Sequence, residues 1–352
     1  MISCPAQTSE TSMTTEQASG GELDSRPTSD ERTRAPLRDD ELNLTLEIAR
    51  RYYFLDQTKV AISRELAISR FQVARLLEEA RRRNIVRIEV GVPGRMNADL
   101  ADALRKALGI ERVLVIETAS SSHDHKLHLI GAAVGQEIAG VVEQGSVLGL
   151  TWSRAVRSMV SQLDHLKPCT VVQLAGHLPV GDDGDPGSVE LVRQVATVAG
   201  GSCLPIYAPM VVPDAGTADA LKSLPDVARA LDMAESCNTA VLSVGAWKSE
   251  ASQVFDVLSP AIRQEAANLG AIGEMGGRAF NRDGEPINSV IDQRIVGITL
   301  DALRSVDRVV ITAFGAHRSE ATVAATRTGL IHTLVVDEDL ARAILDDPGA
   351  PD

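Results

Sequence analysis

Six short apolar runs, rich in valine, isoleucine and leucine, recur along the last two thirds of the chain and alternate with amphipathic segments. The runs are RVLVIE (112–117), SVLGLT (146–151), TVVQLA (170–175), TAVLSVG (239–245), RVVITA (308–313) and TLVVD (333–337). Helical patterns cover residues 126–142, 186–199, 216–234 and 319–327. Buried parallel strands form continuous apolar runs, with helices on both faces of their sheet. The pattern therefore predicts a doubly wound α/β domain over residues 111–352.

Nearer the N-terminus, the pattern is that of a small helical domain. Apolar and tyrosine side chains between residues 42 and 55 can line one face of a helix. Thr58 and Ser69 each precede a further amphipathic segment, where a hydroxyl oxygen can accept a hydrogen bond from an unpaired N–H of the first helical turn. Residues 67 and 68 make a tight connection between these two segments. Small or apolar residues at positions 61, 62, 66, 68, 73, 76 and 77 fit two helices packed at a steep angle. This spacing predicts a helix-turn-helix.

A turn residue and an alternating segment follow the second of these helices. Asn84 suits the left-handed end of a helix, and residues 85–90, IVRIEV, alternate apolar and polar side chains as a strand does. As the strand of a wing, this segment completes a winged helix-turn-helix domain over residues 38–93. Residues 1–37 are rich in Ser, Thr, Glu, Gly and Pro and are expected to be a disordered tail. Residues 94–110 are expected to form a linker helix.

Charge is distributed unevenly along the chain. The 352 residues carry a formal net charge of −13, yet the segment from Arg50 to Arg95 holds eleven Arg and Lys against five Asp and Glu. That segment has a net charge of +6, which leaves −19 for the rest of the chain. A small basic module beside an acidic body is the electrostatic footprint of a nucleic-acid-binding domain.

The second helix of the basic module carries side chains that can read DNA bases. Arg70 and Arg75 can bind guanine, and Gln72 can bind adenine, through paired hydrogen bonds in the major groove. Salt-sensitive contacts to phosphates are expected from Arg81, Arg82, Arg83 and Arg87. A lone arginine cluster is more often a solvated helix face. Here caps, connection, charge and wing coincide, so we expect binding to double-stranded operator DNA, with Thr58 and Ser69 fixing the helix starts.

The cysteines and the hydropathy pattern favour a cytoplasmic protein. Four cysteines lie far apart with no C-x-x-C pair, which indicates neither a zinc ribbon nor a dense disulfide framework. The N-terminus lacks the basic-then-apolar order of a signal peptide. No apolar run approaches the roughly 18 to 20 residues of a membrane span.

Motifs spread along the chain resemble the SorC family of bacterial transcriptional regulators. RYYFLDQTKVAISRELAISRFQVARLLEEARRRNIVRIEV is similar to the opening domain of that family, and the similarity continues in VLGLTWSRAV, VVQLAGH, YAPMVV, GAIGEMGGRAFNRDG, VGITLDAL and TRTGLIHTLVVDE. Asn84 stands where the family usually has Gly, and Ala67 where Gly is common. We expect neither departure to harm a helix-turn-helix.

The resemblance implies both a fold and a function. It implies a DNA-binding regulator of carbohydrate metabolism genes, with a sugar-binding domain that resembles phosphosugar isomerases in fold. A sugar or sugar phosphate would be the effector, and the assembly would be a homodimer or homotetramer.

Ligands of open α/β sheets bind where loops converge at the carboxyl ends of the strands. The loops after the predicted strands offer hydroxyls, an imidazole, two cationic side chains and one carboxylate that can accept from sugar hydroxyls. They also offer glycines, of which Gly176 can let a ligand approach the backbone. The candidate effector-binding residues are Thr151, Ser153, Gly176, His177, Lys248, Glu274, Gly315 and Arg318.

Three of these positions depart from the family pattern. A family lysine usually lies where this chain has Arg318, which keeps the positive charge and can grip phosphate with a fork of donors but cannot form a Schiff base. Ser153 replaces a common glycine, and His177 replaces the second glycine of a family pair, so the effector can differ from the commonest ones. Ordinary turn or surface roles remain open for several candidates, and Trp247 is expected to pack rather than stack on a ligand.

Other chemistries find less support. HDHKLH at residues 123–128 has no further ligand at a metal-binding spacing, and Asp124 suits a helix cap, so we expect no metal and no cofactor. No G-x-S-x-G elbow, P-loop or G-x-G-x-x-G occurs. The alternative to a regulator is an isomerase-like, phosphosugar-converting enzyme with a DNA-binding arm, in which Glu274 or Asp292 could act as acid or base. A third reading is an architectural DNA-binding protein without a ligand.

Overall fold

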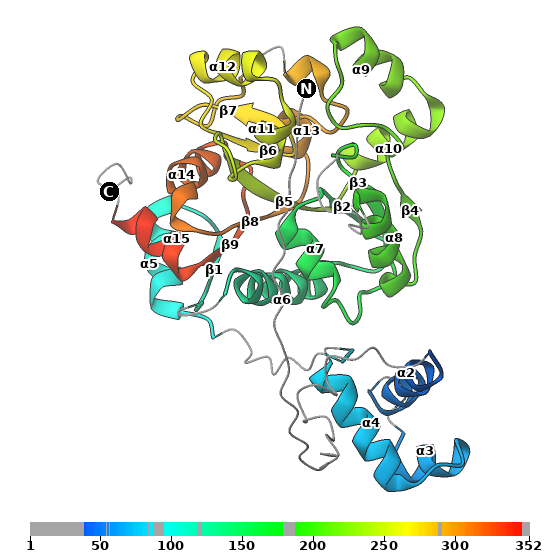
Figure 1. Ribbon diagram of the computed structural model, residues 1–352. Coiled ribbons are helices and arrows are strands. Elements are labelled where there is room, and N and C mark those ends of the chain that lie inside the picture. The colour runs from blue at the N-terminus through cyan, green and yellow to red at the C-terminus, as the bar shows by residue number, and fades with distance from the viewer. Residues whose placement is uncertain are drawn as a thin grey trace, which may run out of the picture. The chain divides into compact units, whose positions relative to one another are not determined.

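The computed structural model divides into two compact units, residues 1–91 and 92–352 (Figure 1). It describes residues 39–53, 55, 57–83, 85–86, 95–118, 122–178, 187–287 and 291–346. The expected tail at residues 1–37, the helix end at Asn84 and Arg87 lie outside the described residues. Only residues 85 and 86 of the expected wing strand are described, and they form a bend.

The larger unit is built on a mainly parallel sheet with the strand order β1-β9-β8-β5-β2-β3-β4. The strands are β1 (Arg112–Ile116), β2 (Val147–Leu150), β3 (Thr170–Gln173), β4 (Cys203–Leu204), β5 (Thr239–Ala246), β8 (Arg308–Ala313) and β9 (Thr333–Asp337). All neighbours along this path are parallel. An antiparallel hairpin of β6 (Gly273–Met275) and β7 (Arg278–Phe280) extends from β5. The six predicted strands and the parallel sheet are confirmed, whereas β4 and the hairpin were not predicted.

Helices cover both faces of this sheet (Figure 1). Along β5, Ala240 and Leu242 belong to one apolar cluster and Val241 to another, as expected for a strand buried on both sides. The first cluster draws on α5 (Ala98–Leu108), α10 (Pro225–Glu235), α14 (Ser319–Arg327) and α15 (Glu338–Leu345). The second draws on α6 (His123–Val141), α7 (Arg154–Val160) and α8 (Gly187–Ala199). The doubly wound arrangement is thus present.

Shorter helices complete the larger unit, namely α9 (Ala215–Lys222), α11 (Gln253–Val257), α12 (Pro260–Asn268), η1 (Asp292–Arg294), α13 (Leu300–Leu303) and η2 (Ala316–Arg318). The single helix expected over residues 216–234 is wrong, because the structure has α9 and α10 there. Pro225 is the first residue of α10, where its missing N–H leaves no hydrogen bond unmade. None of the helices in the described ranges is long and apolar enough to span a bilayer.

The segment expected to be a linker helix does contain a helix, α5, which packs within the larger unit. Asn97 caps it by accepting from the N–H of Leu100, and Gly109 ends it with a φ of 64°. Leu104 is fully buried in the same cluster as Val113 and Val115 of β1. This packing places α5 with the sheet.

The smaller unit contains α2 (Asp39–Tyr53), α3 (Lys59–Glu65) and α4 (Arg70–Arg82). The two predicted caps are confirmed. The Thr58 hydroxyl accepts from the N–H of Ala61 at 3.2 Å, and that of Ser69 accepts from the N–H of Gln72 at 3.1 Å. A small core holds the three helices together, formed by Ile48, Ile62, Val73, Leu76 and Leu77.

The turn between α3 and α4 contains a strained residue. Ala67 has a φ of 54°, in the left-handed region that favours glycine. A left-handed backbone costs a residue with a Cβ roughly 1–2 kcal/mol. The expectation that alanine does no harm at this position therefore needs correction, because the turn forms but is strained.

Replacing Ala67 with glycine should stabilise α3 and α4 by about 1 kcal/mol, because the strain is relieved while part of the gain is lost to glycine's greater freedom in the unfolded chain. Hydrogen exchange of the amides of both helices, followed by mass spectrometry on the full chain, should slow accordingly. Ala74→Gly, inside α4, is the matched control and should cost about 1 kcal/mol. Exchange in Ala67→Gly as fast as in the unmodified chain would contradict the assignment of strain.

Candidate functional site

A pocket lies at the carboxyl ends of β2, β3, β5 and β8. The chain leaves β2 toward β3 and β4 on one side, whereas β5, β8 and β9 lie on the other side. Crossovers that diverge in this way open a crevice between the two central strands, where open α/β sheets bind ligands. Residues 151–155 enter it after β2, and residues 243–245 enter it from β5. The expected location of the pocket thus agrees with the topology.

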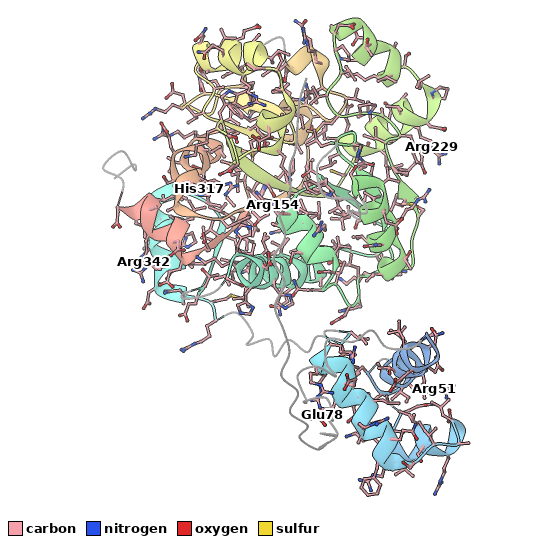
Figure 2. All side chains as sticks on the ribbon, viewed as in Figure 1. Arg51, Glu78, Arg154, Arg229, His317 and Arg342 are labelled. Atoms are coloured by element: carbon pink, nitrogen blue, oxygen red, sulfur yellow. The ribbon has the colours of Figure 1, made fainter. Side chains whose placement is uncertain are left out.

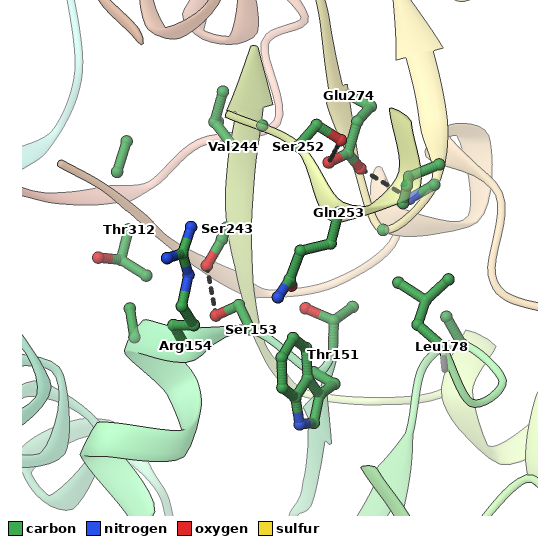
Figure 3. Close-up of a pocket in the computed structure, with 18 of the residues that line it drawn as sticks. Thr151, Ser153, Arg154, Leu178, Ser243, Val244, Ser252, Gln253, Glu274 and Thr312 are labelled. Carbon is green, nitrogen blue, oxygen red and sulfur yellow. Dashed lines mark hydrogen bonds between the residues drawn. The ribbon is translucent and has the colours of Figure 1, made fainter. Parts of the chain in front are cut away.

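Hydroxyl groups form one wall of the pocket (Figure 3). The Ser243 hydroxyl donates to that of Ser153 at 2.7 Å, and Ser153 also caps α7 by accepting from the N–H of Val156 at 3.0 Å. Thr312 of β8 is the register partner of Ser243. Its hydroxyl is buried and has no hydrogen-bond partner among the described residues. Thr151 also lines the pocket and is nearly buried, with its hydroxyl 3.5 Å from the carbonyl of Val241.

Glu274 supplies a buried carboxylate on β6. Oε1 accepts from the Ser252 hydroxyl at 2.9 Å, and Oε2 accepts from the N–H of Gly277 at 3.0 Å. Burial raises the pKa of this carboxyl, and the two hydrogen bonds and the charge of Arg318 oppose the shift without cancelling it. Gly245 faces Glu274 across the β5–β6 pair, and a Cβ there would stand 2.2 Å from Oε1. The carboxylate position thus depends on a glycine.

Cationic side chains gather at the other end of the pocket. Arg318 is only 6% exposed, and its guanidinium donates to the carbonyls of Phe314 at 2.7 Å and Ala251 at 3.1 Å. Burial, together with the neighbouring charge of Arg154, lowers the pKa of Arg318 to about 10, so it remains charged at neutral pH. In the part of the chain that the structure describes, neither Arg154 nor Arg318 has an ion-pair partner.

An open groove continues from this cationic end. Arg154, Arg318 and Gln253 line both the pocket and the groove, and the groove also receives Lys248 and His317. Burial and the charge of Arg318, followed by those of other nearby cations, lower the pKa of His317. The combined surface can hold an anionic group at the groove end and hydroxyls at the carboxylate end.

The structure distributes the eight candidate effector residues unequally. The pocket lining includes Thr151, Ser153, Gly176, Glu274 and Arg318, and the groove lining includes Lys248 and Arg318. His177 and Gly315 belong to neither lining. His177 is exposed, and its backbone pairs with the segment around Pro209. Gly315 has a φ of 84°, and its N–H donates to Asp337 at 2.9 Å.

Gly176 has a packing role that sequence reasoning did not assign. A Cβ there would stand 2.5 Å from the carbonyl oxygen of Ala208 and 2.7 Å from the nitrogen of Met210. Because both obstacles are backbone atoms, the close approach that requires glycine is to the protein's own chain. The role proposed from the sequence, room for a ligand, is therefore not needed to explain this residue.

Sequence reasoning missed several polar residues of the pocket, namely Arg154, Ser243, Ser252, Gln253 and Thr312. The signal for Ser243 and Thr312 was a polar side chain near the carboxyl end of an otherwise apolar run. Arg154 was visible directly after Ser153. Their convergence depends on the adjacency of β2, β5 and β8, which a strand list does not contain.

Two expectations outside the pocket can be compared with the structure. Trp247 packs as expected, with its indole N–H donating to the carbonyl of Arg263 at 3.2 Å and its ring 5.4 Å from that of Phe255. The expected cap at Asp124 is wrong, because Ser122 caps α6 and Asp124 lies in the first turn. Among the described residues, no group of three or more His, Cys, Asp or Glu side chains could hold a metal ion.

The second candidate site is the outer face of α4. Arg70 and Arg75 are exposed, Gln72 is half-buried, and Val73, Leu76 and Leu77 are buried. Near the end of the helix, Arg81 is exposed, whereas Arg82 and Arg83 both pair with Glu79. Figure 2 labels a further exposed acid of this helix, Glu78. The first turns are thus more strongly cationic than the last.

Comparisons with known proteins agree with this architecture. Residues 93–346 match the Sugar-bind family model, described as "Putative sugar-binding domain". The uncharacterized transcriptional regulator YjhU of Escherichia coli K12 is 30% identical over 302 residues, which cover 84% of this chain and 92% of that protein. The deoxyribonucleoside regulator of Bacillus subtilis is 25% identical over 310 residues, covering 86% and 97% respectively. The crystal structure of the full-length sorbitol operon regulator SorC from Klebsiella pneumoniae superposes with a TM-score of 0.65 at 20% identity, covering 88% of this chain and 100% of that one.

The buried carboxylate generates a pH prediction. A carboxyl whose pKa is raised by folding stabilises the protein at pH values below the ordinary pKa of the group. This stabilisation is lost as the pH rises through the pKa that the carboxyl has in the folded protein. Glu274→Gln carries no such charge, so its melting temperature should rise relative to that of the unmodified chain as pH increases above about 4.5, the ordinary pKa of the carboxyl. Glu235→Gln, at an exposed position of α10, controls for the loss of one negative charge. A difference in melting temperature that is independent of pH would contradict the buried, pKa-raised carboxyl.

Proposed function

Because this chain belongs to the SorC family of sugar-binding transcriptional regulators, we propose that its pocket binds a sugar or sugar phosphate and thereby controls how tightly α4 holds operator DNA. The chain is a sugar-responsive transcriptional regulator. The observation that carries the residue-level proposal is the pocket itself, which joins a buried carboxylate to two arginines without ion-pair partners among the described residues.

On the DNA side, we propose that residues 38–93 form a winged helix-turn-helix and that α4 enters the major groove. Arg70 and Arg75 are exposed on its first turns, where fork-shaped guanidinium groups can bind guanine edges. Gln72, half-buried, is the weaker of the base-reading candidates. Phosphate contacts are assigned to Arg81, Arg82 and Arg87, and the caps at Thr58 and Ser69 hold the starts of α3 and α4.

On the effector side, each end of the pocket suits one part of a sugar phosphate. The Glu274 carboxylate can accept hydrogen bonds from sugar hydroxyls, and the hydroxyls of Thr151 and Ser153 can donate or accept. Arg318 can bind phosphate through its fork, with Lys248 adding charge at the groove. The effector can therefore be phosphorylated.

Control of transcription requires coupling between these two sites. An effector that favours one arrangement of the protein changes operator affinity by a factor, and operator DNA must change effector affinity by the same factor. We propose a homodimer or homotetramer, because paired recognition helices match repeated half-sites and effector-dependent spacing between them would supply the two states.

An enzymatic role is not supported. The named relatives are transcriptional regulators, and the acid–base alternative nominated Glu274 or Asp292. Asp292 forms an ion pair with Arg278 at 3.0 Å and is not among the pocket residues. The pocket therefore does not bring those two carboxylates together as an acid–base pair.

Two substitutions should separate the two sites. Arg75→Ala should weaken operator binding about 10- to 100-fold, the loss expected for one paired contact to a base, and leave sugar-phosphate affinity unchanged. Arg318→Ala should weaken sugar-phosphate affinity about 10- to 100-fold, because hydrogen bonds to charged groups contribute about 1.5–3 kcal/mol, and leave operator affinity without effector unchanged. Gel shifts and titration calorimetry measure the two affinities.

Matched variants keep this test selective. Arg229→Ala, at an exposed position of α10 (Figure 2), removes one positive charge that belongs neither to the pocket and groove linings nor to α4, and it should change neither affinity. Arg318→Lys keeps the charge but loses the fork of donors, so its affinity for the sugar phosphate should lie between those of the unmodified chain and Arg318→Ala. Operator affinity that is untouched by Arg75→Ala would refute the assignment of α4 as the recognition helix.

A further inference from the structure

The most exposed large apolar side chain described in the structure is Phe71, at 88% exposure, in the first turn of α4. Other exposed apolar side chains of the smaller unit are far less exposed, such as Leu46 at 47% and Val60 at 43%. Phe71 takes no part in the core that holds the three helices together. A single exposed apolar residue is common on protein surfaces and needs no explanation alone. Its neighbours make this one informative.

Phe71 lies between two exposed arginines in the first turns of α4. Arg70 precedes it in the chain, and Arg75 lies four residues later, which places it on the same side of the helix one turn away. Gln72, by contrast, is half-buried, and its N–H is already bonded to the Ser69 hydroxyl. The outward face at the start of α4 is therefore arginine, phenylalanine and arginine.

A surface of this kind needs a partner that is negatively charged around an apolar point. In the major groove, phosphates flank the base edges, and the C5-methyl group of thymine is the apolar group among the donors and acceptors of the bases. A second copy of the chain fits poorly, because two such faces would bring arginines against arginines.

We propose that Phe71 reads the C5-methyl group of thymine in the operator, beside guanines bound by Arg70 and Arg75. This inference rests on the proposed binding of α4 to DNA and adds a base identity that the arginines do not specify. Burying one methyl group against the ring is worth about 0.8 kcal/mol, which corresponds to about four-fold in affinity for each half-site.

Exchange of thymine for uracil tests the proposal, because it removes only the methyl group. The full-length protein is first used to select a binding sequence from random duplex DNA. Each thymine of that sequence is then replaced by deoxyuridine in turn, and affinities are measured by fluorescence anisotropy. The unmodified protein should lose about four-fold at one thymine position per half-site. Phe71→Ala should bind the thymine and uracil duplexes equally well.

Two further variants isolate the effect. Phe71→Leu keeps an apolar side chain and should retain a preference for thymine, which guards against the case where Phe71→Ala binds too weakly to measure. Val60→Ala, at an exposed position of α3, is the matched control and should keep the full thymine preference. Because Phe71 is outside the core, circular dichroism of Phe71→Ala should match that of the unmodified chain.

Two outcomes would overturn the inference. They are a uracil scan that is flat for the unmodified protein, and an unchanged thymine preference in Phe71→Ala. A flat scan on a selected sequence that still requires Arg75 refutes only the role of Phe71. Failure to select any sequence refutes the DNA-binding role of α4 itself, and this inference with it.

Discussion

The pocket depends on a buried positive charge whose surroundings do not neutralise it. The guanidinium of Arg318 is held by the carbonyl oxygens of Phe314 and Ala251, and Arg154 adds a second charge of the same sign. Removing a charge from water is costly unless it is paired and hydrogen-bonded. The carbonyls offset part of that cost, and an anionic group in the pocket would offset more. The protein thus holds a cationic position that favours an anionic ligand.

The fold makes this arrangement possible through the order of its strands. Because the connections run to opposite sides of the sheet at β2 and β5, a crevice remains at the carboxyl ends of these strands. Glu274 reaches the same crevice from the β6–β7 hairpin, which extends from β5 alone. A carboxylate and an arginine therefore share a pocket without forming an ion pair with each other. This separation leaves each group able to bind a different part of a ligand.

The sequence predicted the sheet better than it predicted the pocket. Strands buried on both faces leave continuous apolar runs, so all six were visible, whereas β4 and the hairpin strands have only two or three residues each and are too short to stand out. Pro225 marks the break between α9 and α10, but the helical periodicity continues across it and led to the prediction of a single helix. Strand-end loops identified Thr151, Ser153, Glu274 and Arg318. Thr312 was missed because its role depends on β8 pairing with β5, a contact between distant segments.

In the smaller unit, the sequence predicted the local elements well but did not predict the exposure of each side chain. Its caps and core follow from local spacing, so Thr58, Ser69 and the buried face of α4 were predicted correctly. The sequence did not disclose how far each side chain of α4 projects. Phe71 and Gln72 are adjacent in the first turn of α4, yet Phe71 is 88% exposed and Gln72 is half-buried. Local pattern locates a helix, and tertiary packing decides which residues it presents.

If the pocket controls how tightly α4 holds DNA, occupancy of the pocket and affinity for DNA are linked. The most direct measurement takes a sugar phosphate that raises the melting temperature of the full-length protein and determines its dissociation constant with and without the operator. The operator's dissociation constant is then determined with and without the sugar phosphate. Both affinities should change, and they should change by the same factor, as thermodynamic linkage requires. A sugar phosphate that binds the pocket and leaves operator affinity unchanged would contradict this link.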